Sequence, residues 1–164
     1  MPTYTQILTE AKIRRFDSPR AKPTFRSLED MLKLFKESQI ICCIEEPFGI
    51  PSTEEEGVPR ITDINYGHVV GAMNAADKNE WDIIFPGSTH ALNLVVCDEV
   101  IGYVHSADGN HKLIGIAHDL PGFTEDEFER QLKKYVQKRR NSYDEECHAK
   151  LFKSIGDIRS YTEY

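Results

Sequence analysis

Short apolar runs separated by turn residues dominate the middle of the chain. The first of them, QIICCIEE at 39–46, predicts a buried strand that ends before Pro47 and Gly49. Further β-like runs follow at 61–65, 68–73, 81–85, 92–96, 99–105 and 112–118. Glycine, asparagine, aspartate and proline separate these runs at short intervals, a spacing that is typical of an antiparallel barrel or sandwich.

Residues 27–38, ahead of these runs, have helical periodicity. Ser27 and Asp30 are spaced as a capping box, in which each side chain accepts a hydrogen bond from the other residue's backbone amide. The apolar residues that follow share one face of the predicted helix: Leu28, Met31, Leu32 and Phe35. Residues 1–26 are polar and contain three prolines, so we expect an arm or wrapping extension there.

The C-terminal third of the chain also has helical spacing. Thr124 and Glu127 form a capping box before a stripe made of Phe128, Leu132, Tyr135 and Val136. Ser142 begins a second candidate helix, whose inward positions are His148, Leu151, Phe152 and Ile155. The pattern therefore predicts two C-terminal helices packed on a strand-built core, an α+β arrangement.

Charge is divided unevenly along the chain of 164 residues. Residues 1–26 carry six basic against two acidic side chains, a net charge of +4, and the remaining residues carry 14 basic against 25 acidic side chains, a net charge of −11. An acidic body argues against nucleic-acid binding and suits a domain that gathers divalent cations, although a solvated acidic surface is the commoner cause of such a charge. No run approaches the roughly 20 apolar residues of a membrane helix, so we expect no membrane insertion.

The four cysteines do not form a CxxC pair, and two of them, Cys42 and Cys43, lie inside an apolar run. We interpret them as reduced, mostly buried thiols of a reducing compartment. This favours a cytoplasmic location. Arg14 and Arg15, in an N-terminal segment with few acids, leave an organellar matrix as the alternative.

Three acids stand close together around the start of the run 81–85. Glu80 and Asp82 are two residues apart, so on a strand their side chains point to the same face, and Asp77 precedes them in a loop. Hard cations such as Mg²⁺ bind where carboxylate oxygens converge. A polar turn before a strand explains the same residues without any site and, taken alone, is the better explanation.

Two further charged positions are candidates for chemistry. Asp108 lies in Asp108-Gly109-Asn110, a hairpin signal, and Lys112 begins the next run, either as an edge charge or as a phosphate contact. Glu45 closes the run 39–46. If it faces inward it needs a partner or a metal, and at the strand end it can equally stand in water.

Four stretches, taken in order, resemble the soluble magnesium-dependent inorganic pyrophosphatases. They are CIEEP (43–47), INYG (64–67), DKNEWDIIFP (77–86) and VIGYVHSADGNHKLIGI (100–116), similar to the family's I-E-I-P, N-Y-G, D-G-D-P-x-D-V-L-V and R-P-I-G…D-x-K-I-I-A-V segments. The resemblance covers residues 40 to about 140. It implies a small closed OB-like β-barrel over 39–164 with two C-terminal helices, preceded by an N-terminal arm and helix at 1–38.

The resemblance also implies a role for particular residues. The implied ligands of Mg²⁺, with Mn²⁺ as an alternative, are Glu45, Asp77, Asp82 and Asp108. The implied contacts to diphosphate or phosphate are Tyr66, Lys112, Tyr135 and Arg60. The implied catalytic residues are Glu80, as a replacement for a missing aspartate, and Asp82.

Several family positions are altered in this chain. Asn79 and Asn110 stand where the family has aspartates, and Val136 stands where it has lysine. Loss of one preorganised electrostatic group commonly costs ~10²–10³ in rate. We therefore predict weak metal-dependent hydrolysis of diphosphate or a related phosphoanhydride.

Two alternatives remain open at this stage. One is a catalytically inactive protein of the same fold, acting as a homo-oligomer, as a subunit of an assembly or as a ligand-binding protein. The other, which the acidic body makes least favoured, is an OB-type barrel that binds nucleic acid.

Overall fold

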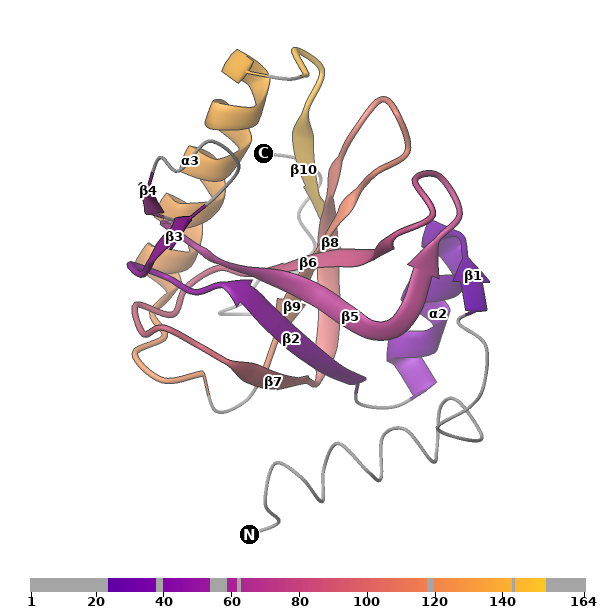
Figure 1. Ribbon diagram of the computed structural model, residues 1–164, viewed down its shortest axis with the longest axis horizontal. Helices are drawn as coiled ribbons and strands as arrows, with labels where there is room; N and C mark the ends of the chain where they lie inside the picture. Colours follow the sequence, from indigo (N-terminus) through magenta and orange to yellow (C-terminus); the bar gives the residue numbers. More distant parts are fainter. Residues whose placement is uncertain are drawn as a thin grey trace, which may run out of the picture.

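The computed structural model describes residues 24–37, 40–53, 59–61, 63–117, 120–142 and 144–152, and Figure 1 shows their arrangement. The elements in chain order are β1 (Thr24–Arg26), α2 (Leu28–Glu37), β2 (Ile40–Glu46), β3 (Pro51–Thr53), β4 (Pro59–Ile61), β5 (Asn65–Asn74), β6 (Glu80–Phe85), β7 (Leu94–Cys97), β8 (Glu99–His105), β9 (Lys112–Ile116), α3 (Glu125–Ser142) and β10 (His148–Leu151). The α+β class is thus confirmed.

Eight strands form one open, mixed sheet. Seven of them lie in the order β10-β8-β9-β6-β5-β2-β7, and β1 pairs with β5 outside this path. The pairings β6–β9 and β1–β5 are parallel, and the other pairings in the sheet are antiparallel. β3 and β4 form a separate two-stranded sheet.

The predicted closed OB-like barrel is wrong. Closure requires the two end strands to pair, and in the described chain β10 and β7 stand at opposite ends of the strand order without pairing. Apolar alternation identifies a strand but carries no information about its partner, and the parallel β6–β9 pair is a long-range choice that no local pattern encodes.

The prediction of two C-terminal helices is half right. The first is α3, capped as expected by Thr124 Oγ1, which accepts a hydrogen bond from the Glu127 amide at 3.1 Å. The second is wrong, because residues His148–Leu151 form strand β10. Ala149 and Leu151 are buried and alternate with more exposed neighbours, so a period of two replaces the helical spacing that the same residues also allow.

The helix predicted at 27–38 is confirmed as α2. Its capping box is formed, since the Ser27 amide donates to Asp30 Oδ2 at 3.4 Å and the Asp30 amide donates to Ser27 Oγ at 3.2 Å. Met31, fully buried, carries α2 into the core. The strand predicted at 39–46 is confirmed as β2.

Each face of the sheet has its own apolar cluster, because side chains alternate along a strand. One cluster contains Met31 of α2 with the buried Trp81 and Ile83 of β6. The other contains Leu132 of α3 with Ile84 of β6. The two helices therefore cover opposite faces, with α3 at the left of Figure 1 and α2 at the right.

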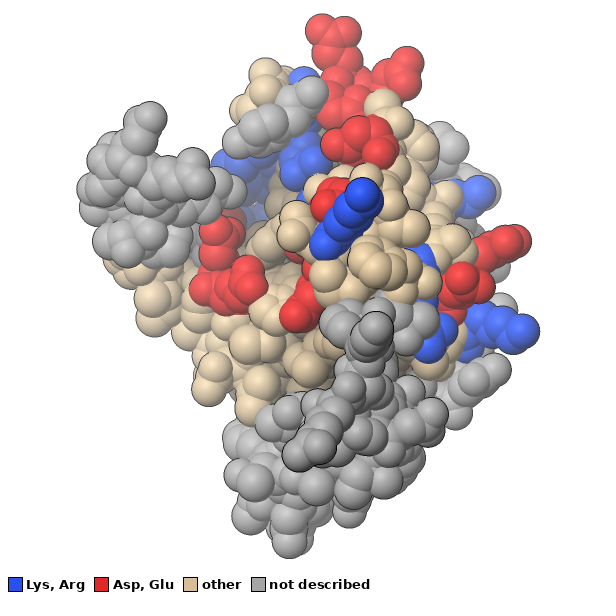
Figure 2. Space-filling view, turned by 45° about the vertical axis from the view of Figure 1, so that its right-hand side comes forward, with Lys and Arg blue, Asp and Glu red and all other residues tan. Residues whose placement is uncertain are grey.

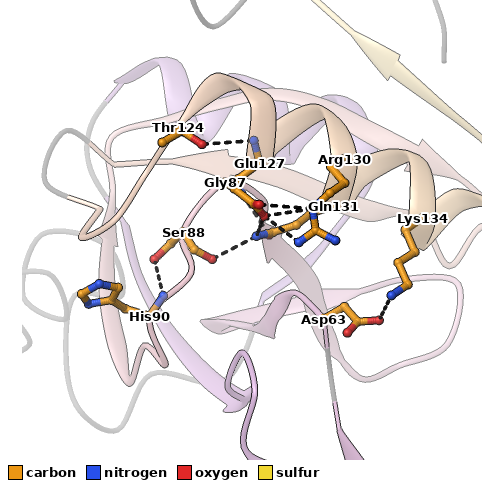
Figure 3. Close-up of polar contacts among 9 residues, drawn as sticks. All are labelled: Asp63, Gly87, Ser88, His90, Thr124, Glu127, Arg130, Gln131 and Lys134. Carbon is orange, nitrogen blue, oxygen red and sulfur yellow. Dashed lines mark hydrogen bonds and ion pairs between the residues drawn. The ribbon is translucent and has the colours of Figure 1, made fainter.

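A polar network fixes α3 to the connection that follows β6 (Figure 3). The buried Gln131 side chain accepts a hydrogen bond from the Gly87 amide at 3.0 Å and donates to the Ser88 carbonyl at 3.2 Å. It also donates to Glu127 Oε2 at 3.2 Å. Ser88 Oγ in turn donates to the Pro121 carbonyl at 2.6 Å, so buried polar atoms on both sides are satisfied.

Asp63 forms an ionic contact between the chain before β5 and α3. Its Oδ2 lies 2.8 Å from Nζ of both Lys134 and Lys138, and these bonds lower the pKa of Asp63 to about 2. The folded pKa is below the ordinary value of about 3.9, so the pair stabilises the fold above pH ~4 and loses its effect as the pH falls towards 2.

We expect Asp63→Asn to lower the free energy of unfolding at pH 7 by only about 0.5–1 kcal/mol, because all three side chains are more than a third exposed and solvent screens the pair. Urea unfolding of both proteins at pH 7 and pH 2 measures this. The difference should shrink to a small fraction at pH 2, close to the folded pKa of Asp63, and an undiminished difference there would contradict the ionic origin.

Part of the predicted organisation falls on undescribed positions. Residues 1–23 of the predicted arm lie outside the described residues, and Thr24–Arg26 pairs with β5 as β1. A separate unit at 1–38 therefore stays a prediction. Among the helices that the structure describes, none has the length and apolar character to cross a membrane.

Candidate functional site

A group of polar side chains continues the α3 face of the sheet beyond its apolar cluster. On β6 the buried Ile84 is followed on the same face, at two-residue steps, by Asp82 and Glu80. His68 of β5 stands directly opposite Asp82, and Lys112 enters from β9. Three neighbouring strands thus bring charged groups together on one face.

Lys112 and Asp82 form the centre of this polar group. Lys112 is only 4% exposed, and its Nζ donates a short hydrogen bond to Asp82 Oδ2. A buried ammonium needs such a partner, because an unpaired charge in the interior costs several kcal/mol. The same Nζ lies 5.8 Å from the centre of the Tyr66 ring, a cation–π distance.

Two tyrosines and an arginine extend the group towards α3. Burial raises the pKa of Tyr66, and the charge of Asp82 raises it further, so its hydroxyl stays protonated. Burial likewise raises the pKa of Tyr135, against the opposing effect of Arg139. The Arg139 guanidinium carbon lies 5.9 Å from the centre of the Tyr135 ring, one helical turn further along α3.

His68 lies between two carboxylates. Its Nδ1 is 2.6 Å from Glu45 Oε1 on β2, and its Nε2 is 3.0 Å from Glu80 Oε2 on β6. Glu80 Oε2 is nevertheless buried without a partner of hydrogen-bonding geometry, so this second contact is electrostatic. Burial raises the pKa of Glu80, His68 opposes that effect, and Glu45 adds to it.

Asp77 and Asp108 lie in two turns that touch. The Asp77 carboxylate accepts a hydrogen bond from the Asn79 amide at 2.9 Å, in the turn between β5 and β6. Asp108 accepts from Ser106 Oγ at 2.8 Å and from the Asn110 amide at 2.9 Å, in the turn between β8 and β9, and these bonds lower its pKa. The turns meet where the Asn74 side chain donates to the Gly109 carbonyl at 3.4 Å.

The four implied metal ligands do not form one site in this arrangement. Each of them is engaged locally: Glu45 with His68, Asp82 with Lys112, and the other two within their own turns. Within the described ranges, no group of three histidine, cysteine or acidic side chains is placed to hold a metal ion. The residues present therefore do not fit the Mg²⁺ cluster that the resemblance implies.

The structure brings together Tyr66, Glu80, Asp82, Lys112 and Tyr135 from the predicted site. Arg60 lies on β4 opposite Ser52, and its side chain is outside the described residues. Sequence analysis missed His68 and Arg139. The available signals were the two-residue step from Tyr66 to His68 and the helical step from Tyr135 to Arg139.

No protein-family model matches the chain, and no curated protein matches it either. The resemblance to the soluble pyrophosphatases therefore rests on the quoted motifs alone and stays a prediction.

The molecular surface has mixed charge. On the face shown in Figure 2, acidic side chains gather at the top and in smaller groups at the left and right, with lysine and arginine side chains among them. The chain as a whole carries a net charge of −7. Binding of an anion on such a protein depends on local cations such as Lys112 and Arg139, because the overall field does not attract it.

Proposed function

We propose that the polar group on the α3 face is the active site of a weak hydrolase for a small phosphorylated substrate, with diphosphate or a related phosphoanhydride as the first candidate. The observation that carries the proposal is the buried Lys112, which lies beside Asp82 and Tyr66 and one strand away from Glu80. A cation on one strand and, on the neighbouring strand, a carboxylate whose pKa burial raises are a combination that phosphate transfer can use.

The binding half of the site consists of Lys112, Arg139 and the hydroxyls of Tyr66 and Tyr135. The two cations supply charge for phosphate oxygens, and the two protonated hydroxyls supply neutral donors. Because Asp82 already neutralises Lys112, an arriving anion has to share that ammonium. We therefore expect modest affinity.

The proton-transfer half consists of Glu80, with His68 and Glu45 beside it. In the proposed step, the oxygen of a water molecule forms a bond to phosphorus as its proton moves to the Glu80 carboxylate. The bond from phosphorus to the bridging oxygen then breaks, and that oxygen leaves as part of a phosphate held by Lys112. His68 Nε2, 3.0 Å from Glu80 Oε2, acts on this step electrostatically.

The test is release of phosphate from diphosphate by the purified full chain, with Mg²⁺, with Mn²⁺ and without added metal. Glu80→Gln should lower kcat by about 10²-fold or more and leave KM within a few-fold, because proton transfer contributes that much and the binding groups are unchanged. The matched control is Glu129→Gln, on the exposed side of α3, which should behave as the wild type.

If Glu80→Gln releases phosphate as fast as the wild type, Glu80 is not the group that accepts the proton of the attacking water. No release above a blank without protein would refute hydrolysis itself. Mg²⁺ as a cofactor stays a prediction of the resemblance, and dependence of the rate on added metal tests it separately.

The second candidate is a non-catalytic protein that binds a phosphorylated ligand or a partner in an assembly. The engagement of Asp82 by Lys112, together with the separate engagement of the other three implied metal ligands, favours it. Calorimetric binding of diphosphate without phosphate release would support this candidate, and removal of residues 1–23 with measurement of oligomeric state would test an assembly role.

A further inference from the structure

Three histidines gather at the end of the sheet that carries β10, on three segments of the chain. His105 of β8 and His148 of β10 are directly opposite each other, and their rings stack with centres 4.8 Å apart and 14° between the planes. The ring of His111, just before β9, lies 4.9 Å from that of His105. We call these residues the histidine cluster.

One hydrogen bond of the cluster requires a neutral ring, at His111. The Ser106 amide donates to His111 Nδ1 at 3.0 Å, so this nitrogen must carry a free lone pair. His105 Nδ1 is buried and has no hydrogen-bond partner among the described residues. His148 Nδ1 lies 2.9 Å from the Glu146 carbonyl, which can only accept, so this nitrogen carries a proton in either charge state.

The cluster is not arranged to bind a metal. Stacked rings aim their nitrogens along parallel planes rather than at one point, and the described part of the chain contains no trio of ligands placed for an ion. Without a metal, the property of these side chains that matters near neutral pH is that an imidazole can gain a proton there.

The charged and titratable groups around the cluster act in both directions. Burial lowers the pKa of His111, and His105, His148 and Lys112 lower it further, whereas Asp108 raises it. Asp144, in the connection between α3 and β10, interacts electrostatically with His105. It also interacts with Arg139 of α3, so its negative charge acts on both residues. Tyr103 of β8, whose ring packs 5.6 Å from that of His111, is a further titratable neighbour, and Glu146 and Lys150 lie two residues from His148 on either side.

β10 is a short strand at one end of the sheet. Among the described residues it pairs with β8 alone, and Phe152 adds one hydrogen bond from its amide to the Ile101 carbonyl at 2.7 Å. Its other face contributes Ala149 and Leu151 to the α3 cluster. A positive charge on stacked rings would therefore act where the strand is held by a small number of bonds.

We propose that the histidine cluster is a pH-sensitive joint, and that its protonation below about pH 6 loosens β10 from β8. The folded state favours the neutral ring of His111, because its Nδ1 accepts the hydrogen bond from the Ser106 amide, so above the ordinary pKa of about 6.5 this site does not lower stability. As the pH falls, the unfolded chain binds a proton at His111 more readily than the folded one, and a positive charge beside the stacked rings lowers the stability of this edge. Loosening exposes the edge of β8 as a surface for strand addition.

The test is amide hydrogen exchange of the full chain at pH 7.5 and pH 5.5, corrected for the intrinsic pH dependence of exchange. We expect the amides of β10 to open about threefold or more faster at pH 5.5. His148→Phe, which keeps a ring for stacking but cannot be charged, should remove the acceleration. His90→Gln, which removes an exposed histidine outside the cluster, should leave it unchanged.

Equal opening of β10 at both pH values would overturn the proposal, and so would an acceleration that persists in His148→Phe. A second measurement on the wild type alone protects the test against a variant that does not fold. In an NMR titration the cluster should contain at least one ring that titrates below pH ~6.5. Independent titration of all three rings near 6.5 would contradict the joint.

Discussion

Replacing Gly67 with alanine should prevent folding or lower the free energy of unfolding by more than about 4 kcal/mol, a loss that few single substitutions cause. A Cβ at this position would stand 2.0 Å from the Cys43 carbonyl oxygen and 2.8 Å from the Ile44 Cα. Both are backbone atoms of β2, which pairs with β5 at Ile44 and Gly67. The clash can be relieved only by separating two central strands.

Gly49→Ala is the matched control for this prediction. Gly49 has φ +71°, and no atom lies within 4 Å of a Cβ built there, so the substitution costs only the left-handed backbone strain of about 1–2 kcal/mol. Yield of soluble protein and urea unfolding compare the two variants. A loss for Gly67→Ala that is no larger than that for Gly49→Ala would show that β2 and β5 are not in close contact.

The second large effect is expected for Lys112→Met. This variant leaves the Asp82 carboxylate partly buried without its ammonium partner, which typically costs about 3–5 kcal/mol. Asp82 retains some exposure and the nearby Tyr66 hydroxyl, so we expect the lower end of that range. Urea unfolding at pH 7 measures the loss.

A double variant separates the unpaired charge from the lost packing. Asp82→Asn combined with Lys112→Met removes both charges and should be more stable than Lys112→Met alone, which a double-mutant cycle measures as coupling between the two sites. Lys78→Met, at an exposed turn position, should change stability by no more than about 0.5 kcal/mol. If the double variant is no more stable than Lys112→Met, the cost of that substitution does not come from an unpaired Asp82 charge.

The candidate site was predictable in parts that local geometry controls. Glu80 and Asp82 could be placed on one face from their spacing alone, and Asp108 could be placed in a hairpin turn. Their partners could not be predicted, because Lys112 reaches Asp82 through a parallel pairing between β6 and β9, and His68 reaches Glu45 and Glu80 from a third strand. Such contacts depend on strand order, which no window of neighbouring residues contains.

The amino-acid sequence by itself determined most of the elements of this protein. The capping box at Ser27 and the Thr124 cap start α2 and α3, and the short apolar run of β2 makes it a strand, because caps and short apolar runs act within a few residues. Tertiary structure alone decided that the sheet stays open, that His148–Leu151 is a strand, and that the acids divide between Lys112, His68 and two turns. Those outcomes depend on which distant surface each segment buries. Where the spacing of apolar residues allows both a strand and a helix, burial against a distant partner decides between them.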